Sequence, residues 1–368
     1  MCRWASHACQ SVPPCPLSCL ADRIGGVSIS RREFLKLSSL SAAALAAASL
    51  PVVSKDATGL IGRVAYESVS VFDRPIFNAS TTAYRFRDEL LNVFYSLNPL
   101  TGPAYNPLWY RISDGYVHAG LIQPVGIENN QPVDAVPQQG GLFRVTVPFT
   151  QPYKFTRQGG WQREPLFLLY FNSNHWVTAI VEGPDGEAWY QITESWEGVQ
   201  YYAKGIHLQP IPDEQFSPTF TDVPAAEKRI EISLALQSLT AFEGDRIVLR
   251  TPISSGVRNT GASGLPTETP KGSFNVNSKL PAKYMGDNRL TDTLGDKYLP
   301  GVPWTAFFAE GGYAIHGAYW HNNFGWPMSR GCINVRPLEA QWLYRWMTPV
   351  AEVGEWEARG LGTRVIVA

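Results

Sequence analysis

Hydrophobic and polar positions alternate in short runs along most of the chain, a pattern that predicts strands joined by turns. Residues 176–181 are mostly apolar, residues 182–186 contain a Gly-Pro-Asp-Gly turn signal, and residues 189–192 are mostly apolar again. This segment predicts a strand, a turn and a second strand. Residues 229–234 alternate polar with apolar side chains, and residues 246–250 form a similar run. Both are therefore expected to be strands.

The rest of the C-terminal part is interpreted from the same signals. In chain order we expect a turn within 238–245, a short strand at 272–276, a long polar stretch at 279–303 that forms a mobile cover, a helix at 338–347 just after Pro337, and a closing strand at 363–367.

Two segments in the N-terminal half resemble each other. The first, 109–125, contains Trp-Tyr-Arg-Ile, then Tyr116 and Gly-Leu-Ile-Gln-Pro-Val; the second, 189–211, contains Trp-Tyr-Gln-Ile, then Tyr201 and Gly-Ile-His-Leu-Gln-Pro-Ile. Such internal similarity predicts two copies of one module. Short, turn-bounded strands in modules of about 70 residues favour small barrels.

The ending of each copy resembles bacterial SH3-like domains, most clearly at 109–125. The resemblance implies SH3-like modules at 58–137 and 140–215, and the Pro-, Thr- and Ala-containing segment 216–227 is then a linker. Aromatic side chains in such modules either fill the barrel core or line a groove for cell-wall peptide or glycan. For Trp109 and Trp189 we favour the core.

Composition excludes two broad classes of protein. Hydrophobic residues make up 44% and charged residues 17% of the 368 positions, so the chain as a whole is not disordered. Lys and Arg number 31 and Asp and Glu number 32, a net charge of −1, which argues against a partner bound mainly through nucleic-acid phosphates. We therefore expect no nucleic-acid partner.

The N-terminus carries an export pattern. Residues 28–36 read Ser-Ile-Ser-Arg-Arg-Glu-Phe-Leu-Lys, an Ala- and Leu-rich run follows at 37–50, and Pro51 comes next. Paired arginines ahead of a short apolar run with small residues are typical of a twin-arginine signal, with 46–48 as the candidate cleavage site. The sequence therefore predicts an export signal over 1–53 and a protein exported to the periplasm or cell wall.

Alternatives to a cleaved signal stay open: an uncleaved anchor, and an N-terminal helix of the mature fold. The apolar run covers only about 21 Å as a helix, too short for an ordinary membrane span. After residue 60 no stretch of 18 apolar residues occurs, so no transmembrane segment is expected in the mature chain. We further expect that translation starts at Val27, read from an alternative start codon.

Cysteine usage focuses attention on one thiol. Four of the five Cys lie at or before residue 19, so the exported chain keeps only Cys332 and forms no internal disulfide. His118, His175 and His207 have no metal-ligand spacing and are expected to be structural.

Residues 312–337 contain the chemistry-bearing cluster. A catalytic thiol needs a base that lowers its apparent pKa and supplies a proton to the leaving amine, and His316 is suited to serve Cys332 in this way. Arg330 adds positive potential that favours the thiolate. Gly331 permits a close backbone approach, and the amides of Gly331 and Cys332 are candidate donors to an oxyanion.

This cluster resembles the YkuD-type L,D-transpeptidases of the bacterial cell wall. Their signature is His-Gly or His-Ser, a spacer, then Ser-x-Gly-Cys-x-Asn or Ser-x-Gly-Cys-x-Arg; the chain has His316-Gly317 and the run 329–334, Ser-Arg-Gly-Cys-Ile-Asn. Residues 267–274 resemble the family's Thr-Pro-x-Gly-x-Phe element. Two positions depart from the common pattern: Arg330 stands where many members have His, and Gly317 where others have Ser.

The resemblance implies a mostly β catalytic domain over 228–368. It implies that Cys332 is the nucleophile, that His316 is the base and that the Gly317 carbonyl orients it. The residues that would shape the site and hold the acyl donor are Ser329, Arg330, Gly331 and Asn334. We expect the chain as a whole to be mainly β: two SH3-like barrels followed by this YkuD-type domain.

Several side chains near the motif have competing interpretations. Cys332 as a buried inert thiol is disfavoured by its Gly-Cys turn. A zinc site of His316, His321 and Cys332 lacks a fourth ligand. We place His321 in the site wall; Trp320, Phe324 and Trp326 fit the donor groove or simple packing. Three further aromatic residues lie where the family has a flap: Tyr284, Tyr298 and Trp304.

The sequence predicts an L,D-transpeptidase that acts on peptidoglycan stem peptides. In the implied reaction Cys332 attacks the bond between an L-centre and D-Ala, D-Ala leaves, and a neighbouring stem resolves the thioester to give a 3→3 cross-link. No cofactor or metal is needed. Two alternatives stay open, an L,D-carboxypeptidase and a non-catalytic cell-wall-binding protein.

Overall fold

The computed structural model describes residues 59–100, 102–194, 199–258, 267–285 and 298–368. The described part is mainly β, with 47% of its residues in strands and 8% in helices, which confirms the predicted mainly β fold class. Within the described ranges, no helix has the length and apolar character needed to cross a membrane. The predicted export signal at 1–53 and the expected start at Val27 lie outside the described residues.

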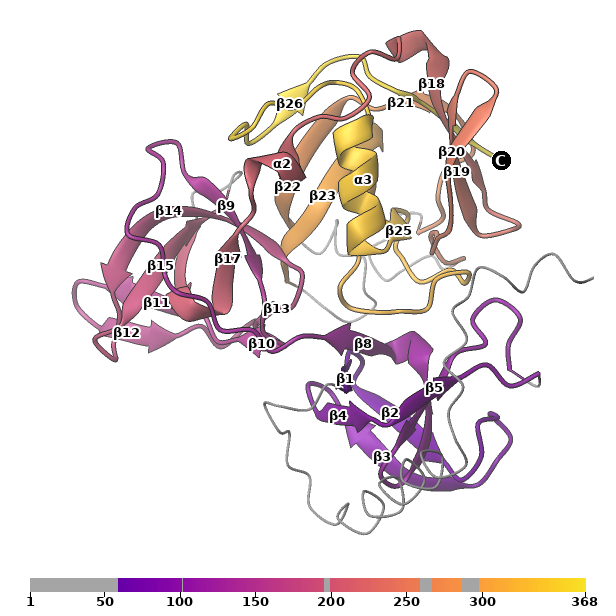
Figure 1. The fold of residues 1–368 in the computed structure, drawn as a ribbon, viewed down its shortest axis with the longest axis horizontal. Coiled ribbons are helices and arrows are strands. Elements are labelled where there is room, and N and C mark those ends of the chain that lie inside the picture. Colours follow the sequence, from indigo (N-terminus) through magenta and orange to yellow (C-terminus); the bar gives the residue numbers. More distant parts are fainter. Residues whose placement is uncertain (1–58, 101, 195–198, 259–266, 286–297) are drawn as a thin grey trace, which may run out of the picture. The chain divides into compact units, whose positions relative to one another are not determined.

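The first module consists of two small antiparallel sheets (Figure 1). Their orders are β4-β1-β8 and β3-β2-β7-β6-β5. The strands are β1 (Leu60–Val64), β2 (Ser68–Phe72), β3 (Thr81–Phe86), β4 (Leu90–Val93), β5 (Tyr95–Leu97), β6 (Trp109–Ile112), β7 (Gly115–His118) and β8 (Ile122–Val125). Their inward positions form one buried cluster that includes Val71, Tyr110 and Ile122, as expected for strands with period-2 burial.

The second module has a seven-stranded sheet, ordered β12-β11-β16-β15-β14-β9-β17, and a small β10-β13 pair. The strands are β9 (Gly141–Val145), β10 (Phe149–Thr150), β11 (Tyr153–Thr156), β12 (Gly160–Arg163), β13 (Leu169–Tyr170), β14 (Asn174–Glu182), β15 (Ala188–Thr193), β16 (Gln200–Lys204) and β17 (Leu208–Pro210). β14 and β15 pair antiparallel around the predicted turn, so this strand, turn and strand are confirmed.

The internal repeat in the sequence corresponds to a repeat in the structure. In the first module β6 and β7 are followed by the 3₁₀ turn η1 (Ala119–Leu121) and β8; in the second, β15 and β16 are followed by η2 (Gly205–His207) and β17. Trp109 and Trp189, at matching places, are 0% and 1% exposed. Both side chains therefore fill module cores. This confirms the prediction that we favoured, and not the alternative that they line a groove.

The C-terminal part, from residue 228, contains two five-stranded sheets, β20-β19-β18-β27-β21 and β25-β24-β23-β22-β26. The strands are β18 (Lys228–Ser233), β19 (Ser238–Glu243), β20 (Arg246–Pro252), β21 (Gly272–Asn275), β22 (Ser278–Met285), β23 (Leu299–Ala309), β24 (Tyr313–Gly317), β25 (Ile333–Val335), β26 (Ala358–Arg359) and β27 (Arg364–Val367). β27 pairs parallel with β18, so the last strand of this part closes onto its first.

The predicted turn within 238–245 is confirmed at residues 244–245; residues 238–243 before it form strand β19, which was not predicted. One prediction for this part was wrong. The stretch 279–303 is not a mobile cover at its ends, because β22 and β23 pair antiparallel and are buried along most of their length. Lys279 made β22 look polar in the sequence, but its ammonium group donates to the carbonyls of Tyr344 and Met347 at 2.8 and 2.7 Å.

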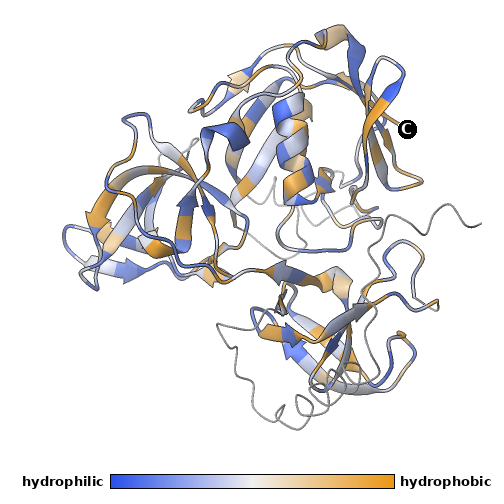
Figure 2. Cartoon of the chain, in the orientation of Figure 1, coloured by the Kyte–Doolittle hydropathy of each residue, from blue (hydrophilic) through white to orange (hydrophobic). Residues whose placement is uncertain are grey.

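Helix α3 (Pro337–Trp346) follows β25 directly and confirms the predicted helix. Pro at its first position fixes its start, together with two bonds in which the backbone amide and the guanidinium of Arg336 donate to the Glu339 carboxylate. The helix mixes hydrophobic and hydrophilic positions (Figure 2) and buries Leu343 among the residues of the C-terminal core. Its last carbonyls accept from buried Lys279 and from Lys228, which satisfies groups that helix ends leave without partners.

The segment 216–227 joins the second module to the C-terminal part. Helix α2 (Asp213–Phe216) precedes it and the 3₁₀ turn η3 (Ala225–Glu227) ends it. The Phe216 ring lies 6.0 Å from the rings of both Trp304 and Tyr344. Trp304 is 1% exposed and is therefore part of the core. Our expectation that it belongs to a flap was wrong.

Candidate active site

Two parallel strands bring the predicted catalytic residues together. β24 pairs with β25 in a register that sets His316 opposite Asn334 and Ile315 opposite Ile333. Cys332 lies one residue before β25 and two before Asn334, and residues two apart along a strand point to the same face. The thiol is thus held at the start of β25, beside the strand that carries His316.

His316 is fully buried, and its orientation follows from one contact. Its Nδ1 lies 3.2 Å from the carbonyl oxygen of Gly317, the contact that the family resemblance implies. A ring nitrogen bonded to a carbonyl keeps its proton, so the other nitrogen, Nε2, is the one that exchanges protons with a substrate or thiol. Trp320 packs on this ring, with 5.6 Å between the ring centroids.

A turn built on Ser329 holds the nucleophile. The Ser329 hydroxyl donates to the carbonyl of Cys332 at 2.6 Å and accepts from the amide of Gly331 at 3.0 Å. The Gly331 amide is therefore used inside the turn. Our expectation that it points into the site as one of two oxyanion donors is wrong for this residue.

Position 331 requires glycine, because both its backbone conformation and the space around it exclude a side chain. Its φ is +121°, and an added Cβ would lie 2.4 Å from Cε1 of Tyr313. The Gly331 carbonyl accepts from the Thr269 hydroxyl at 2.8 Å, and that hydroxyl accepts from the Gly256 amide at 2.9 Å. The segment around Thr269 is the element at 267–274 noted in the sequence, so its role is to brace the nucleophile turn.

Tyr313 is a site residue that the sequence reasoning missed. Its ring covers Gly331, and its pKa is raised by burial and, secondarily, by the negative charge that Cys332 carries when it is ionised. Cys332 is 6% exposed, and its thiol donates to the carbonyl of Gly312 at 3.6 Å. The only signal in the sequence is the position of Tyr313, three residues before His316 on the same strand.

His321 lies behind the site and holds Asn334. Its Nε2 is 2.9 Å from the Asn334 side-chain amide, and its Nδ1 accepts from the Asn323 backbone amide at 3.2 Å. Burial, and secondarily the positive charge of His316, lowers the pKa of His321 to about 3. It is thus a neutral residue of the inner wall, 3% exposed, whose direct partner is Asn334.

The C-terminal part of the chain is similar to one known family. Residues 227–367 match the family model of the YkuD L,D-transpeptidase catalytic domain. The match covers the His316 to Cys332 region together with both C-terminal sheets and α3.

Solved L,D-transpeptidases show likeness to the chain. The enzyme from Xylanimonas cellulosilytica is 28% identical, over 38% of this chain and 60% of that one, with a TM-score of 0.28. A cysteine-to-serine variant from Enterococcus faecium is 25% identical, over 39% and 50%, with a TM-score of 0.29. The enzyme from Mycobacterium smegmatis is 18% identical, over 66% and 93%, with a TM-score of 0.31.

These structures add no argument beyond the family match, because every TM-score is far below 0.5. The chain spans three fifths of the length of the first of them and half that of the second. No curated protein sequence matches the chain.

Both departures of the YkuD domain from the common motif can be examined in the structure. At Gly317 an added Cβ would lie 2.9 Å from Pro303 and 3.0 Å from Pro337, so the strand and the start of α3 leave little room for Ser. Arg330 is half-buried, and its Nε is shielded from solvent and has no hydrogen-bond partner among the described residues. Within the described part of the chain it makes no ion pair.

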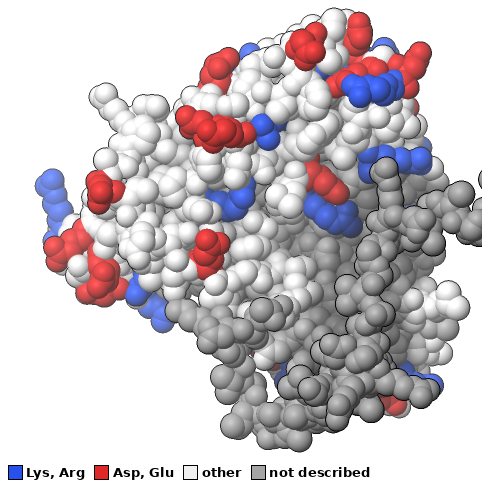
Figure 3. Space-filling view, in the orientation of Figure 1, with Lys and Arg blue, Asp and Glu red and all other residues white. Residues whose placement is uncertain are grey.

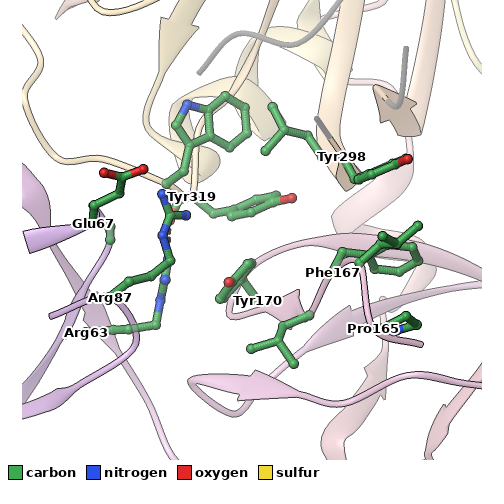
Figure 4. A pocket seen from close by; sticks show the side chains of 13 residues that line it. Arg63, Glu67, Arg87, Pro165, Phe167, Tyr170, Tyr298 and Tyr319 are labelled. Carbon is green, nitrogen blue, oxygen red and sulfur yellow. Dashed lines mark hydrogen bonds between the residues drawn. The ribbon is translucent and has the colours of Figure 1, made fainter. Parts of the chain in front are cut away.

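A cavity of about 430 Å³ (Figure 4) has Trp320 among its lining residues. Arg63 and Arg87 line one side of it, and Phe167 and Tyr298 the other. Arg63 is engaged: its guanidinium pairs with Asp88 at 2.8 Å and also donates to a glutamine side chain. Trp320, which we predicted to bind substrate, lines this cavity and also packs against the His316 ring.

The histidines outside the motif have ordinary partners. His118 contacts the carbonyl of Asn106, His175 contacts Ser173, and His207 contacts Thr150, each at 2.8 Å. Across the ranges described, no group of three or more His, Cys, Asp or Glu side chains is arranged to hold a metal ion.

Proposed function

We propose that this protein is a cysteine L,D-transpeptidase that forms 3→3 cross-links in peptidoglycan. The observation that carries the proposal is the parallel pairing of β24 and β25, because the base lies on β24 and the nucleophile is the residue directly before β25. The family match supports the reaction class. Nucleophile, base and a group that orients the base are the parts that covalent acyl transfer requires.

Acylation uses the Cys–His pair directly. Nε2 of His316 takes the thiol proton, and the Cys332 thiolate attacks the carbonyl carbon between the L-centre of the stem and D-Ala. The tetrahedral intermediate collapses as its C–N bond breaks, and His316 returns the proton to the leaving amine of D-Ala. The Gly317 carbonyl keeps the imidazole in the tautomer that this exchange needs.

Resolution of the thioester completes the cycle. The side-chain amine of a diamino acid on a neighbouring stem attacks the thioester carbonyl, His316 removes its extra proton, and the thiol leaves as the new amide forms. If water attacks instead, the same acyl-enzyme gives an L,D-carboxypeptidase.

The test is product analysis with disaccharide tetrapeptide as the substrate. We expect cross-linked dimers that lack one D-Ala, and a covalent adduct on the protein at the mass of the donor minus D-Ala. Cys332→Ala should give neither. Loss of D-Ala without dimers assigns the carboxypeptidase, and dimers formed by Cys332→Ala would refute the proposal.

The base is tested separately. His316→Gln keeps a polar side chain of similar length but cannot exchange a proton. Because general acid–base catalysis contributes about 10²–10⁴-fold, acylation should slow by that range while the thiol remains present. Thiol titration of the unfolded variant controls for loss of Cys332.

We also propose the setting of the enzyme. Twin arginines at 31–32 and the apolar run that follows support export by the twin-arginine route to the periplasm or cell wall, where the stem peptides lie. The matching element order of the two N-terminal modules supports SH3-like barrels. The balanced charge supports a partner other than nucleic acid; acidic and basic side chains are interspersed on the face in Figure 3.

A further inference from the structure

An open groove runs between the first module and the loop that leads to the nucleophile. It encloses about 550 Å³, within the range of small-ligand sites. We call it the aromatic groove and define it by Phe77, Tyr105 and His118 of the first module and Asn323, Trp326 and Met328 of the loop. It is separate from the cavity in Figure 4, with which it shares no lining residue.

Aromatic faces in this groove are left uncovered by the fold. Phe77 is 52% and Trp326 53% exposed, whereas Trp109, the aromatic residue conspicuous in the sequence, is fully buried. Tyr105 and Trp326 lie with ring centroids 5.0 Å apart and planes at 34°. Phe77 rests on Trp109 and His118, with 5.0 Å to each ring. Rings supported from behind in this way present fixed faces to a ligand.

The described residues of the groove are uncharged. They include no Lys, Arg, Asp or Glu, and their polar groups are hydroxyls of Tyr and Ser and the Asn323 amide. His118 does not supply charge, because burial lowers its pKa and its Nδ1 accepts from the Gly120 amide at 3.3 Å. Stem peptides carry carboxylates, so they do not match this surface. A pyranose ring with hydroxyl and acetamido groups matches it. The flat apolar faces of the sugar can stack on the aromatic rings, and its hydroxyl and acetamido groups are neutral donors and acceptors for the polar groups of the groove.

Backbone contacts connect the groove to the catalytic turn. The Val257 amide donates to the Ser329 carbonyl at 2.9 Å, and the Met328 amide donates to the Ser255 carbonyl at 3.0 Å. The Asn106 side chain of the first module donates to the Asn322 carbonyl at 2.9 Å. The groove wall and the turn that holds Cys332 are therefore parts of one braced structure.

We propose that the aromatic groove binds the N-acetylated sugar rings to which the donor stem is attached. The proposal rests on the function proposed above and assigns the first module a part in substrate binding. Three stem residues separate the sugar from the carbonyl that Cys332 attacks; three α-linked residues span about 10–11 Å when extended, and linkage through a side chain adds a few Å. A sugar site must therefore lie close to the nucleophile, and Met328 in the groove wall precedes Cys332 by only four positions.

The test compares two donors, the disaccharide tetrapeptide and the free tetrapeptide, by kcat/KM for D-Ala release. An aromatic contact contributes about 0.5–1.5 kcal/mol beyond area burial, so we expect the unmodified protein to prefer the disaccharide donor by about 3–10-fold, through KM. Phe77→Ala and Trp326→Ala should each reduce the ratio of the two kcat/KM values toward one. Because the readout is a ratio, partial loss of folded protein cancels.

Phe155→Ala is the matched control, since Phe155 is 50% exposed on the second module and outside the groove. It should leave the ratio unchanged. Equal kcat/KM for both donors in the unmodified protein overturns the proposal, and so does a preference that survives both groove variants.

A second readout separates this proposal from the catalytic one. Binding of peptide-free glycan oligosaccharide, titrated by tryptophan fluorescence, needs no turnover. Saturable binding that Phe77→Ala weakens supports the groove even if no D-Ala is released, in which case only the proposed function fails. No binding of the oligosaccharide, or binding of the free tetrapeptide that Phe77→Ala weakens equally, overturns the sugar site.

Discussion

Nε2 of His321 lies 2.9 Å from the side-chain amide of Asn334, the residue that pairs with His316 across β24 and β25. A neutral imidazole has one N–H and one acceptor nitrogen. Because the Asn323 backbone amide donates to Nδ1, the proton of His321 must be on Nε2. The structure places the Asn334 amide nitrogen at this contact, and two N–H groups cannot share one hydrogen bond. We therefore expect the side-chain amide to be turned by 180°, with its oxygen accepting from Nε2 of His321.

This assignment predicts the tautomer of His321. In a ¹⁵N-labelled protein, Nδ1 of His321 should show the shift of an unprotonated nitrogen and Nε2 that of a protonated one, without titration from pH 8 down to pH 5. The resonance is assigned by its loss in His321→Gln. A protonated Nδ1, or titration near pH 6.5, would contradict the network.

The low pKa of His321 also predicts how stability depends on pH. The folded pKa is about 3, against about 6.5 for an unfolded histidine, so between these values the unfolded chain binds more protons. Stability is therefore retained above pH 6.5 and lost progressively as pH falls toward 3. Denaturant unfolding at pH 7, 5.5 and 4.5 measures this loss.

The comparison with His321→Gln isolates the contribution of this one residue. His207, with a pKa of about 4 from burial, changes stability in the same direction, so the slope in the variant is reduced but not abolished. A variant that shows the full slope of the unmodified protein would mean that His321 is not the group being titrated.

Gly331→Ala tests the turn that holds the nucleophile. The change forces a side chain into φ +121° and against the Tyr313 ring, so we expect a loss of about 1–3 kcal/mol of stability and at least tenfold slower acylation. Gly186→Ala is the matched control: its φ is +77°, and an added Cβ meets nothing within 4 Å. Comparable acylation by the two variants would show that the contact with Tyr313 does not shape the site.

The catalytic pair could be predicted from the sequence because its signal is local. His316 and Cys332 lie within one motif, and their pairing needs only that two short strands run side by side. The hairpin of β14 and β15 was predictable for the same reason, since its turn residues lie between its strands.

What could not be predicted depends on contacts between distant segments. In the sequence, Lys279 makes β22 look polar. In the structure, carbonyls at the end of α3, more than sixty residues later, accept hydrogen bonds from its ammonium group. Tyr313 becomes a site residue only when the turn at Gly331 packs against it. The aromatic groove joins Phe77 to Trp326, far apart in the chain, whereas the sequence drew attention to Trp109, which lies beneath Phe77.

Arg330 is expected to recognise the carboxylate of the departing D-Ala. This carboxylate is attached to the carbon next to the scissile nitrogen, so every productive donor brings it within a few Å of the Cys332 sulfur. The neighbouring charges are already paired, Arg258 with Glu268 and Arg336 with Glu339, whereas Arg330 makes no ion pair within the described ranges.

Hydrogen bonds to charged groups contribute about 1.5–3 kcal/mol, so Arg330→Gln should lower kcat/KM for the tetrapeptide donor by about 10–100-fold. With a donor whose terminal carboxylate is replaced by a carboxamide, the unmodified protein and Arg330→Gln should differ by less than about threefold, because there is no charge to lose. Arg330→Lys keeps the charge but lacks the planar guanidinium fork. Its kcat/KM for the tetrapeptide donor should therefore lie between the values of the unmodified protein and Arg330→Gln. An equal loss on both donors would show that Arg330 serves the turn or the thiolate and not the carboxylate of D-Ala.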